Sequence, residues 1–411
     1  MTQESLTEKL AAHLMRPVDE PTRQRARLHL LDWLGCVAGA LKTDSEERTA
    51  LTYNRTAGWM GNLLEMDDVH REAILHPGPV IWPSVTKEGK FAMDEALDKA
   101  VRGYEAMISI GATFDRYHYE HWHPTSTAGI FGATVSEAFE LQTISYEHLV
   151  NALGLAGSVS GGFWRTRHEG DDAKQFHIVN AIHTGYIAAT AAKAGAKGPR
   201  FILEGEQGLY AATCKNPRPM ALPEHWRIHE VSFKPWGACR HAHPAIDAAM
   251  ELKARLGALN GDIIVETYSD AINFCDRPDP QNKLDAKFSI QHAIAIVAQS
   301  GAPELADFEP EAIAGLSNVR ANVKVQEAVD ISARYPKHYG ARITCGGETV
   351  ELIDTLGDPE RPMSMEQIIG KARALIYWGG LPDQEADRAI DIALYGDETY
   401  QINAMLGDWL S

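Results

Sequence analysis

Hydrophobic residues recur every three or four positions through much of the first half of the chain. Between Pro21 and Leu41, and again in the run MDEALDKAVRGYEAMISIGATF, the apolar positions follow the period of a helix with a wide buried face. Asp94 stands where an N-cap residue would begin the second run. Both segments are therefore predicted to be helical.

Three later segments, 129–141, 145–161 and 173–195, are rich in alanine and glycine. Small residues let helices approach one another closely, so these segments indicate a crowded helical core. No alternating strand pattern interrupts the chain before about residue 225. This half is expected to form a large all-helical domain.

The hydrophobic pattern changes after this point. Residues 261–274 contain a β-branched run, residues 317–325 alternate, and GARITCGGETVELID contains two alternating runs around Gly346-Gly347, which is a hairpin signal. Helical patterns lie between these runs and return near the end of the chain. We expect a mainly α protein, in which a smaller α+β domain (232–362) is inserted before the C-terminal helices of the all-helical domain (1–231 and 363–411).

The chain length of 411 residues and a hydrophobic content of 45% fit a two-domain globular protein. The net charge of −17 repels nucleic acid and anionic membrane surfaces and argues against both as partners. The start of the chain lacks the pattern of a secretory or transit peptide, and no apolar run is long enough for a membrane span. Five scattered cysteines, without a C-x-x-C pair, indicate a reducing, cytoplasmic setting.

The stretch GNLLEMDDVHREAILHPGPV (61–80) combines several acidic residues and histidines with a His-Pro-Gly turn. A zinc helix would need two histidines four residues apart, whereas His70 and His76 are six apart. A charged helix end is a second interpretation. The stiff turn after His76 favours a third, a fixed imidazole for acid/base chemistry, with Glu65 in support and Asp67, Asp68 and His70 as structural candidates.

Two further groups lie in the same half of the chain. His123, in the motif HPTST, precedes a predicted helix whose N-terminus offers donors for an anion, whereas His118 and His121 are expected to be interfacial or solvated. Lys174 and His177 share a predicted helix face and follow a basic segment that supplies local positive charge, made of Arg165, Arg167 and His168.

The last group, SFKPWGACRHAHPAIDAA, lies at the start of the predicted α+β domain. It contains Lys234, Arg240 and His243, and Arg240 offers carboxylate recognition. Cys239 with His243 could instead form a nucleophilic pair, although no third orienting residue is apparent.

In this order, the four groups resemble the MmgE/PrpD family. GYE (103–105), LEGEQGL (203–209), DAKFSIQ (285–291) and PMSMEQIIGKARAL extend the resemblance almost from end to end. It implies a helical domain, an α+β lid, a homodimer, and an active site in the cleft between the domains without metal or organic cofactor. Glu65 falls where relatives commonly have Asp, and Val69 falls where they often have Thr.

The resemblance implies a lyase acting on a small anionic carboxylate. We expect a 2-methylcitrate dehydratase-like hydro-lyase, with a decarboxylase, an epimerase or a non-catalytic carboxylate-binding relative as alternatives. The expected catalytic residues are His76, His123, Glu65 and Lys174. The expected substrate-binding residues are Lys234, Arg240, His243, His177 and Asp68.

Overall fold

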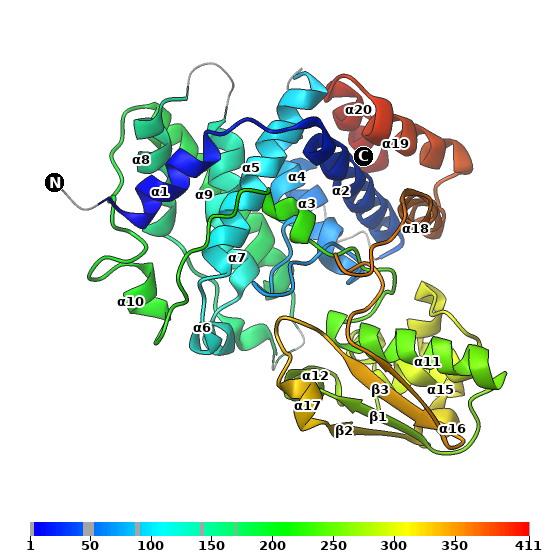
Figure 1. Cartoon of the computed structure of the whole chain (residues 1–411). Helices are drawn as coiled ribbons and strands as arrows, with labels where there is room; N and C mark the ends of the chain where they lie inside the picture. Colours follow the sequence, from blue (N-terminus) through cyan, green and yellow to red (C-terminus); the bar gives the residue numbers. More distant parts are fainter. Residues whose placement is uncertain are drawn as a thin grey trace. The chain divides into compact units, whose positions relative to one another are not determined.

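The structure is a computed structural model that describes residues 4–43, 53–86, 91–139, 144–167, 169 and 171–410 (Figure 1). It divides the chain into two compact units. The helical unit comprises Met1–Val231 with Ser364–Ser411, and the sheet unit comprises Ser232–Met363. The prediction of a mainly helical chain with a small β-sheet is confirmed.

The described residues of the helical unit form helices and isolated bridges, without a strand. Its α-helices are α1 (Leu6–Leu14), α2 (Glu20–Gly39), α3 (Tyr53–Leu63), α4 (Gly78–Val85), α5 (Met93–Gly111), α6 (Arg116–His121), α7 (Pro124–Ala138), α8 (Tyr146–Gly157), α9 (Ala173–Lys193), α10 (Leu209–Thr213), α18 (Met365–Trp378), α19 (Asp383–Tyr395) and α20 (Tyr400–Leu410).

Helix α2 is a central element of this unit and packs against α3, α5, α18 and α19 (Figure 1). Asp19 caps it by accepting a hydrogen bond from the backbone of Thr22. Helix α5 matches the second predicted run, but its N-cap is Ala92. Asp94 lies in the first turn, so its predicted capping role is wrong; the positive helix end still favours an acid there.

Small residues allow the close packing of α5, α7 and α9 that the sequence indicated. A Cβ atom on Gly185 of α9 would lie 2.5 Å from the Cβ of Ala133 in α7. A Cβ atom on Gly103 of α5 would lie 2.1 Å from the hydroxyl of Ser136, also in α7. Larger residues at these positions would push the helices apart.

The sheet unit contains a four-stranded mixed sheet in the order β2-β1-β3-β4. Strand β1 pairs in parallel with β2, whereas the β1–β3 and β3–β4 pairs are antiparallel. Gly346 and Gly347 both have positive φ and form the predicted hairpin turn. The strands are β1 (Ile263–Thr267), β2 (Val323–Glu327), β3 (Ala341–Cys345) and β4 (Glu348–Leu352).

Helices α11 and α14 pack on this sheet and on each other, and the apolar residues between them form the core of the unit. The first residues of the alternating run 317–325 form helix α16 instead of strand. The helices are α11 (His243–Leu256), α12 (Ser269–Cys275), α13 (Lys283–Lys287), α14 (Ile290–Gln299), α15 (Pro310–Gly315), α16 (Ser317–Arg320) and α17 (Val329–Ser332).

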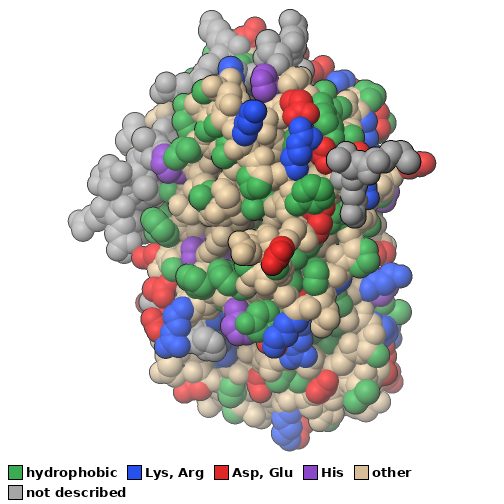
Figure 2. Space-filling view, turned by 90° about the vertical axis from the view of Figure 1, so that its left-hand side faces the viewer, with side chains coloured by type: hydrophobic (Ala, Val, Ile, Leu, Met, Phe, Trp, Pro, Cys, Tyr) green, Lys and Arg blue, Asp and Glu red, His purple; other side chains and the backbone are tan. Residues whose placement is uncertain are grey.

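Among the described residues, no helix has the length and apolar character that a membrane span requires. On the face drawn in Figure 2, acidic, basic and hydrophobic side chains are interspersed.

Candidate active site

The acidic and histidine residues of the motif 61–80 lie in a loop between two helices. Helix α3 ends at Leu63 and α4 begins at Gly78, and we call the connection 64–77 the histidine loop. Within it, His70 and Leu75 exchange two backbone hydrogen bonds of 2.9 and 3.3 Å, which close a tight turn. Glu65, Asp67 and Asp68 are buried, so a solvated charged helix end is excluded.

The imidazole of His76 is held from one side by two oxygen acceptors. Its Nδ1 lies 2.9 Å from Oδ2 of Asp67 and 3.1 Å from the backbone oxygen of Asp68. Asn62 donates a hydrogen bond of 2.8 Å to the same Asp67 oxygen. A carboxylate and a carbonyl oxygen only accept, so Nδ1 carries the proton and Nε2 of the neutral ring is the basic nitrogen.

The Nε2 atom of His76 has no hydrogen-bond partner among the residues that the structure describes. The side chain is 16% exposed, so this nitrogen belongs to a partly accessible ring whose other nitrogen is fixed. A histidine with one oriented nitrogen and one available nitrogen is suited to move a proton.

Asp68 holds the His-Pro-Gly turn in place from the interior. Its Oδ1 accepts the backbone N–H of Gly78 at 2.8 Å, and its Oδ2 accepts the hydroxyl of Tyr104 at 2.7 Å. The Nδ1 atom of His29 lies 2.8 Å from the same Oδ2. Burial raises the pKa of Asp68 to about 6, although the bonds from Tyr104 and Gly78 oppose this shift. Asp68 was expected to bind substrate, but both of its carboxyl oxygens contact protein groups.

Glu65 pairs with Lys174 of α9. The Lys174 ammonium donates to Oε1 of Glu65, and the lysine lies in the first turn of α9 with a side chain that is 17% exposed. Glu65 has a φ of 57°, a left-handed conformation that few residues other than glycine adopt. The loop thus directs Glu65 toward Lys174 and Asp67 toward His76.

His123 is the N-cap residue of α7, and its Nδ1 lies 3.2 Å from Nδ1 of His177. Its ring stacks on Trp164, with centroids 4.2 Å apart. Burial lowers the pKa of His123 well below its usual value, and the charges of His177, Lys174 and His76 lower it further. His123 is therefore neutral, and these groups are its electrostatic neighbours.

A hydrogen bond joins the histidine loop to α7: the backbone N–H of His76 donates to the hydroxyl of Thr125 at 3.1 Å. The helical unit thereby brings together five of the residues predicted from the sequence. They are Glu65, His76, His123, Lys174 and His177.

Two of the three predicted residues of the sheet unit, Arg240 and His243, have partners within that unit. Arg240 forms a buried ion pair with Asp358, which also accepts a hydrogen bond of 2.7 Å from Ser232. The ring nitrogens of His243 lie 3.3 Å from the Arg240 guanidinium and 3.0 Å from the backbone oxygen of Ala238. Lys234 is fully buried.

The remaining histidines and arginines have other surroundings. His118 was expected to be interfacial or solvated, but it is fully buried and stacks on Phe114, because α6 turns it inward. His121 is exposed, as expected. Arg165 pairs with the nearby Glu169 on the surface, and His168 lies outside the described residues.

Several residues of the site were missed from the sequence. His29, Tyr104 and Trp164 each contact a predicted residue, and Asn62 contacts Asp67, which was not among the predicted site residues. Asn62 lies in the motif 61–80 and Trp164 adjoins the basic segment, whereas His29 lies in a helix with no local chemical pattern. A polar residue within an apolar helix, such as His29 in α2, was the available signal.

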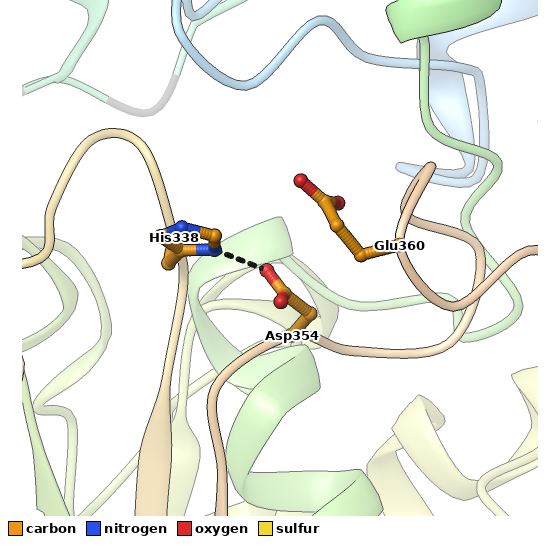
Figure 3. Close-up of side chains that lie close together, drawn as sticks. All are labelled: His338, Asp354 and Glu360. Carbon is orange, nitrogen blue, oxygen red and sulfur yellow. Dashed lines mark hydrogen bonds and ion pairs between the residues drawn. The ribbon is translucent and has the colours of Figure 1, made fainter.

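One histidine and two acids also gather in the sheet unit, at the open end of the β3–β4 hairpin. Potential ligand atoms of His338, Asp354 and Glu360 lie within 4.8 Å of one another, and His338 Nδ1 is 2.8 Å from Asp354 Oδ1 (Figure 3). Glu360 is exposed and the other two are half-buried. This is the arrangement of a surface ion pair with a neighbouring acid, and we assign no metal to it.

Comparison with known proteins agrees with the motifs. The model of the MmgE/PrpD N-terminal domain matches residues 50–221, and that of the MmgE/PrpD C-terminal domain matches residues 236–395. The chain is also similar to cis-aconitate decarboxylase of Homo sapiens, with 24% identity over 344 residues that cover 76% of this chain and 69% of that protein. The chain belongs to the MmgE/PrpD family.

Proposed function

We propose that the protein is a cofactor-independent hydro-lyase that acts on a small di- or tricarboxylate of the 2-methylcitrate type. The observation that carries this proposal is His76, with Nδ1 held by Asp67 and Nε2 available, together with the cation of Lys174, since both His76 and Lys174 are electrostatic neighbours of His123. Dehydration next to a carboxylate needs these two elements, a base for the α-proton and a positive charge for the electrons that it leaves behind.

In the proposed reaction, Nε2 of His76 takes the proton from the carbon next to a substrate carboxylate. The electron pair of that C–H bond forms the new C=C bond while the neighbouring C–OH bond breaks. The Asp67 carboxylate stabilises the imidazolium formed on His76. This imidazolium can return its proton to the departing hydroxide, so water leaves and the base is regenerated.

Lys174 is the proposed carboxylate clamp of the helical unit. Its ammonium is paired with Glu65 in the structure, so a substrate carboxylate would share or replace that interaction. His123 is neutral and can hydrogen-bond a substrate oxygen without adding charge. In the sheet unit, Lys234 remains our candidate for a further carboxylate contact, with Arg240 and His243 beside it in the sequence.

A decarboxylase is the second candidate, because the relative from Homo sapiens is a cis-aconitate decarboxylase. In that reaction the C–C bond to a carboxylate breaks, CO2 leaves, and the resulting carbanion takes a proton. His76 would then act as the acid and Lys174 would still stabilise negative charge.

The purified protein should be incubated with 2-methylcitrate, citrate and isocitrate while the absorbance of the unsaturated product is followed, and with cis-aconitate while released CO2 is measured. We expect dehydration, and CO2 release instead would establish the second candidate. Carboxylate binding without reaction or exchange of substrate protons into D2O would show a non-catalytic relative.

His76→Ala should lower the rate by at least about 100-fold, a usual general acid/base contribution, without unfolding the protein. His121→Ala is the matched control, because His121 is exposed and its Nδ1 contacts the backbone of its own helix. Full activity of His76→Ala would exclude His76 from the chemistry.

A further inference from the structure

A buried lysine from near the end of the chain reaches the histidine loop. Lys371 lies in α18, and its Nζ donates hydrogen bonds of 2.5 Å to Oδ1 of Asp32 in α2 and 2.6 Å to the backbone oxygen of Met66. Its side chain is only 4% exposed. The proposed mechanism gives this lysine no direct part.

The carbonyl that Lys371 holds lies between the two acids that orient the site. Met66 follows Glu65, which pairs with Lys174, and precedes Asp67, which contacts His76. Consecutive Cα atoms are only about 3.8 Å apart, so a bond to the Met66 carbonyl restrains the peptide planes on both sides of it. One ammonium group therefore fixes the backbone from which both acidic side chains extend.

Glu65 shows why the loop needs such an anchor. A non-glycine residue with positive φ is strained and persists only where its surroundings enforce it. The loop backbone next to Glu65 accepts the bond from Lys371, and the buried ammonium has no water to bond instead. Without this bond, both the strained residue and the neighbouring Asp67 would lose a restraint on their backbone.

The charge of Lys371 is suited to this interior. Burial acts to lower the pKa of its ammonium, but the carboxylates of Asp32 and Asp67 outweigh burial, so the pKa is raised and the group stays charged. A charged donor makes a stronger bond to a carbonyl oxygen than a neutral one.

We propose that Lys371 is a positioning residue that holds the Met66 carbonyl and thereby keeps Asp67 on His76 and Glu65 on Lys174. The kinetic effect expected from this inference rests on the proposed function, whereas the orientation of His76 can be measured without a substrate.

The test compares Lys371→Met, Asp32→Asn and the double variant with the wild-type protein. The double variant removes both buried charges, so it avoids leaving the Asp32 carboxylate without its partner. Asp32→Asn alone keeps the Lys371 bond to the Met66 carbonyl. Lys99→Met is the matched control, because Lys99 is also buried and ion-paired, with Glu95 at 3.1 Å, and has no contact with the histidine loop.

The first measurement is the imidazole ¹⁵N spectrum of His76, assigned by difference with His76→Gln. We expect one tautomer, protonated at Nδ1, in the wild type, Asp32→Asn and Lys99→Met, and a mixture of tautomers in both variants that lack Lys371. The second is steady-state kinetics, in which loss of Lys371 should lower kcat roughly 10- to 100-fold with little change in KM. Thermal denaturation records whether each variant is folded.

A folded Lys371→Met or double variant with the wild-type spectrum and kcat would overturn the proposal. An Asp32→Asn variant with a mixed His76 spectrum would overturn it as well, because the bond from Lys371 to the Met66 carbonyl would then not determine the His76 tautomer. This result does not depend on whether the variants with Met at position 371 fold. Absence of turnover in the wild type would count against the proposed function alone, because the spectra still report the orientation of His76.

Discussion

The contact between Asp67 and His76 predicts that Asp67→Asn strongly slows the reaction. The substitution keeps the size and shape of the side chain and leaves an oxygen that can accept the bond from Asn62. It removes the negative charge next to Nδ1 of His76, which the structure places 2.9 Å from Oδ2 of Asp67. Asp67 is almost fully buried, so water cannot replace the lost charge.

The size of the effect follows from the charge that His76 gains when it accepts a proton. An imidazolium and a carboxylate whose charge centres are about 4 Å apart attract by about 4 kcal/mol at an effective dielectric constant of about 20. Each 1.4 kcal/mol changes a rate about tenfold, so Asp67→Asn should lower kcat by roughly 10²- to 10³-fold. KM should change little, because Asp67 does not bind the substrate in this mechanism.

Steady-state kinetics of Asp67→Asn, His76→Ala and the double variant provide the assay. If the two residues act as one unit, the double variant should be no slower than His76→Ala. A folded Asp67→Asn variant within about threefold of the wild-type kcat would refute the reasoning, since it would place the loss far below the effect of one charged partner.

Two predictions concern stability. Gly78→Ala should destabilise the protein by about 1–3 kcal/mol in urea unfolding, because its Cβ would lie 2.7 Å from Oδ1 of Asp68. The control, Gly370→Ala in α18, has nothing within 4 Å of the added Cβ and should stabilise the protein slightly. Equal effects of the two substitutions would contradict this reasoning. Burial lowers the pKa of His118 from 6.5 to about 3. The contribution of the neutral His118 to the free energy of unfolding is therefore complete above pH 6.5 and is lost as the pH falls toward 3. The stability of His118→Phe relative to wild type should therefore rise by about 2.5 kcal/mol on going from pH 7 to pH 4.5, and His121→Phe, on the exposed side of the same helix, should show no such rise.

The elements of the fold could be predicted where one local pattern sufficed. The apolar positions of α2 and α5 repeat with the helical period, and two consecutive glycines define the β3–β4 turn. The run 317–325 shows the limit of such patterns. Val319 and Val323 are four residues apart, a spacing that fits both a helix and an alternating strand, and the structure divides the run between α16 and β2.

The sequence predicted which types of residue form the candidate site, but not which acid contacts His76 and which contacts Lys174. The stiff turn after His76 marked the histidine, yet the sequence could not show which acid faces it. That choice depends on the left-handed conformation of Glu65, which directs its side chain toward Lys174 and leaves Asp67 for His76. No local pattern encodes such a turn at a glutamate.

The contribution of Lys371 was beyond prediction for a different reason. Its partners Asp32 and Met66 are more than 300 positions away in the chain, and a lysine in a helix is ordinarily read as a surface residue. Only the packing of α18 against α2 brings them together.

The interrupted course of the helical unit has a consequence for its synthesis. Residues up to Val231 leave the ribosome before the sheet unit, and α18 follows only after Met363. At 5–20 residues per second, roughly 15–60 seconds separate the emergence of the histidine loop's own helices from that of Lys371. A nascent chain in this interval contains His76, Asp67 and Lys174 but lacks the anchor of Met66, so catalytic competence should be among the last properties that the protein acquires.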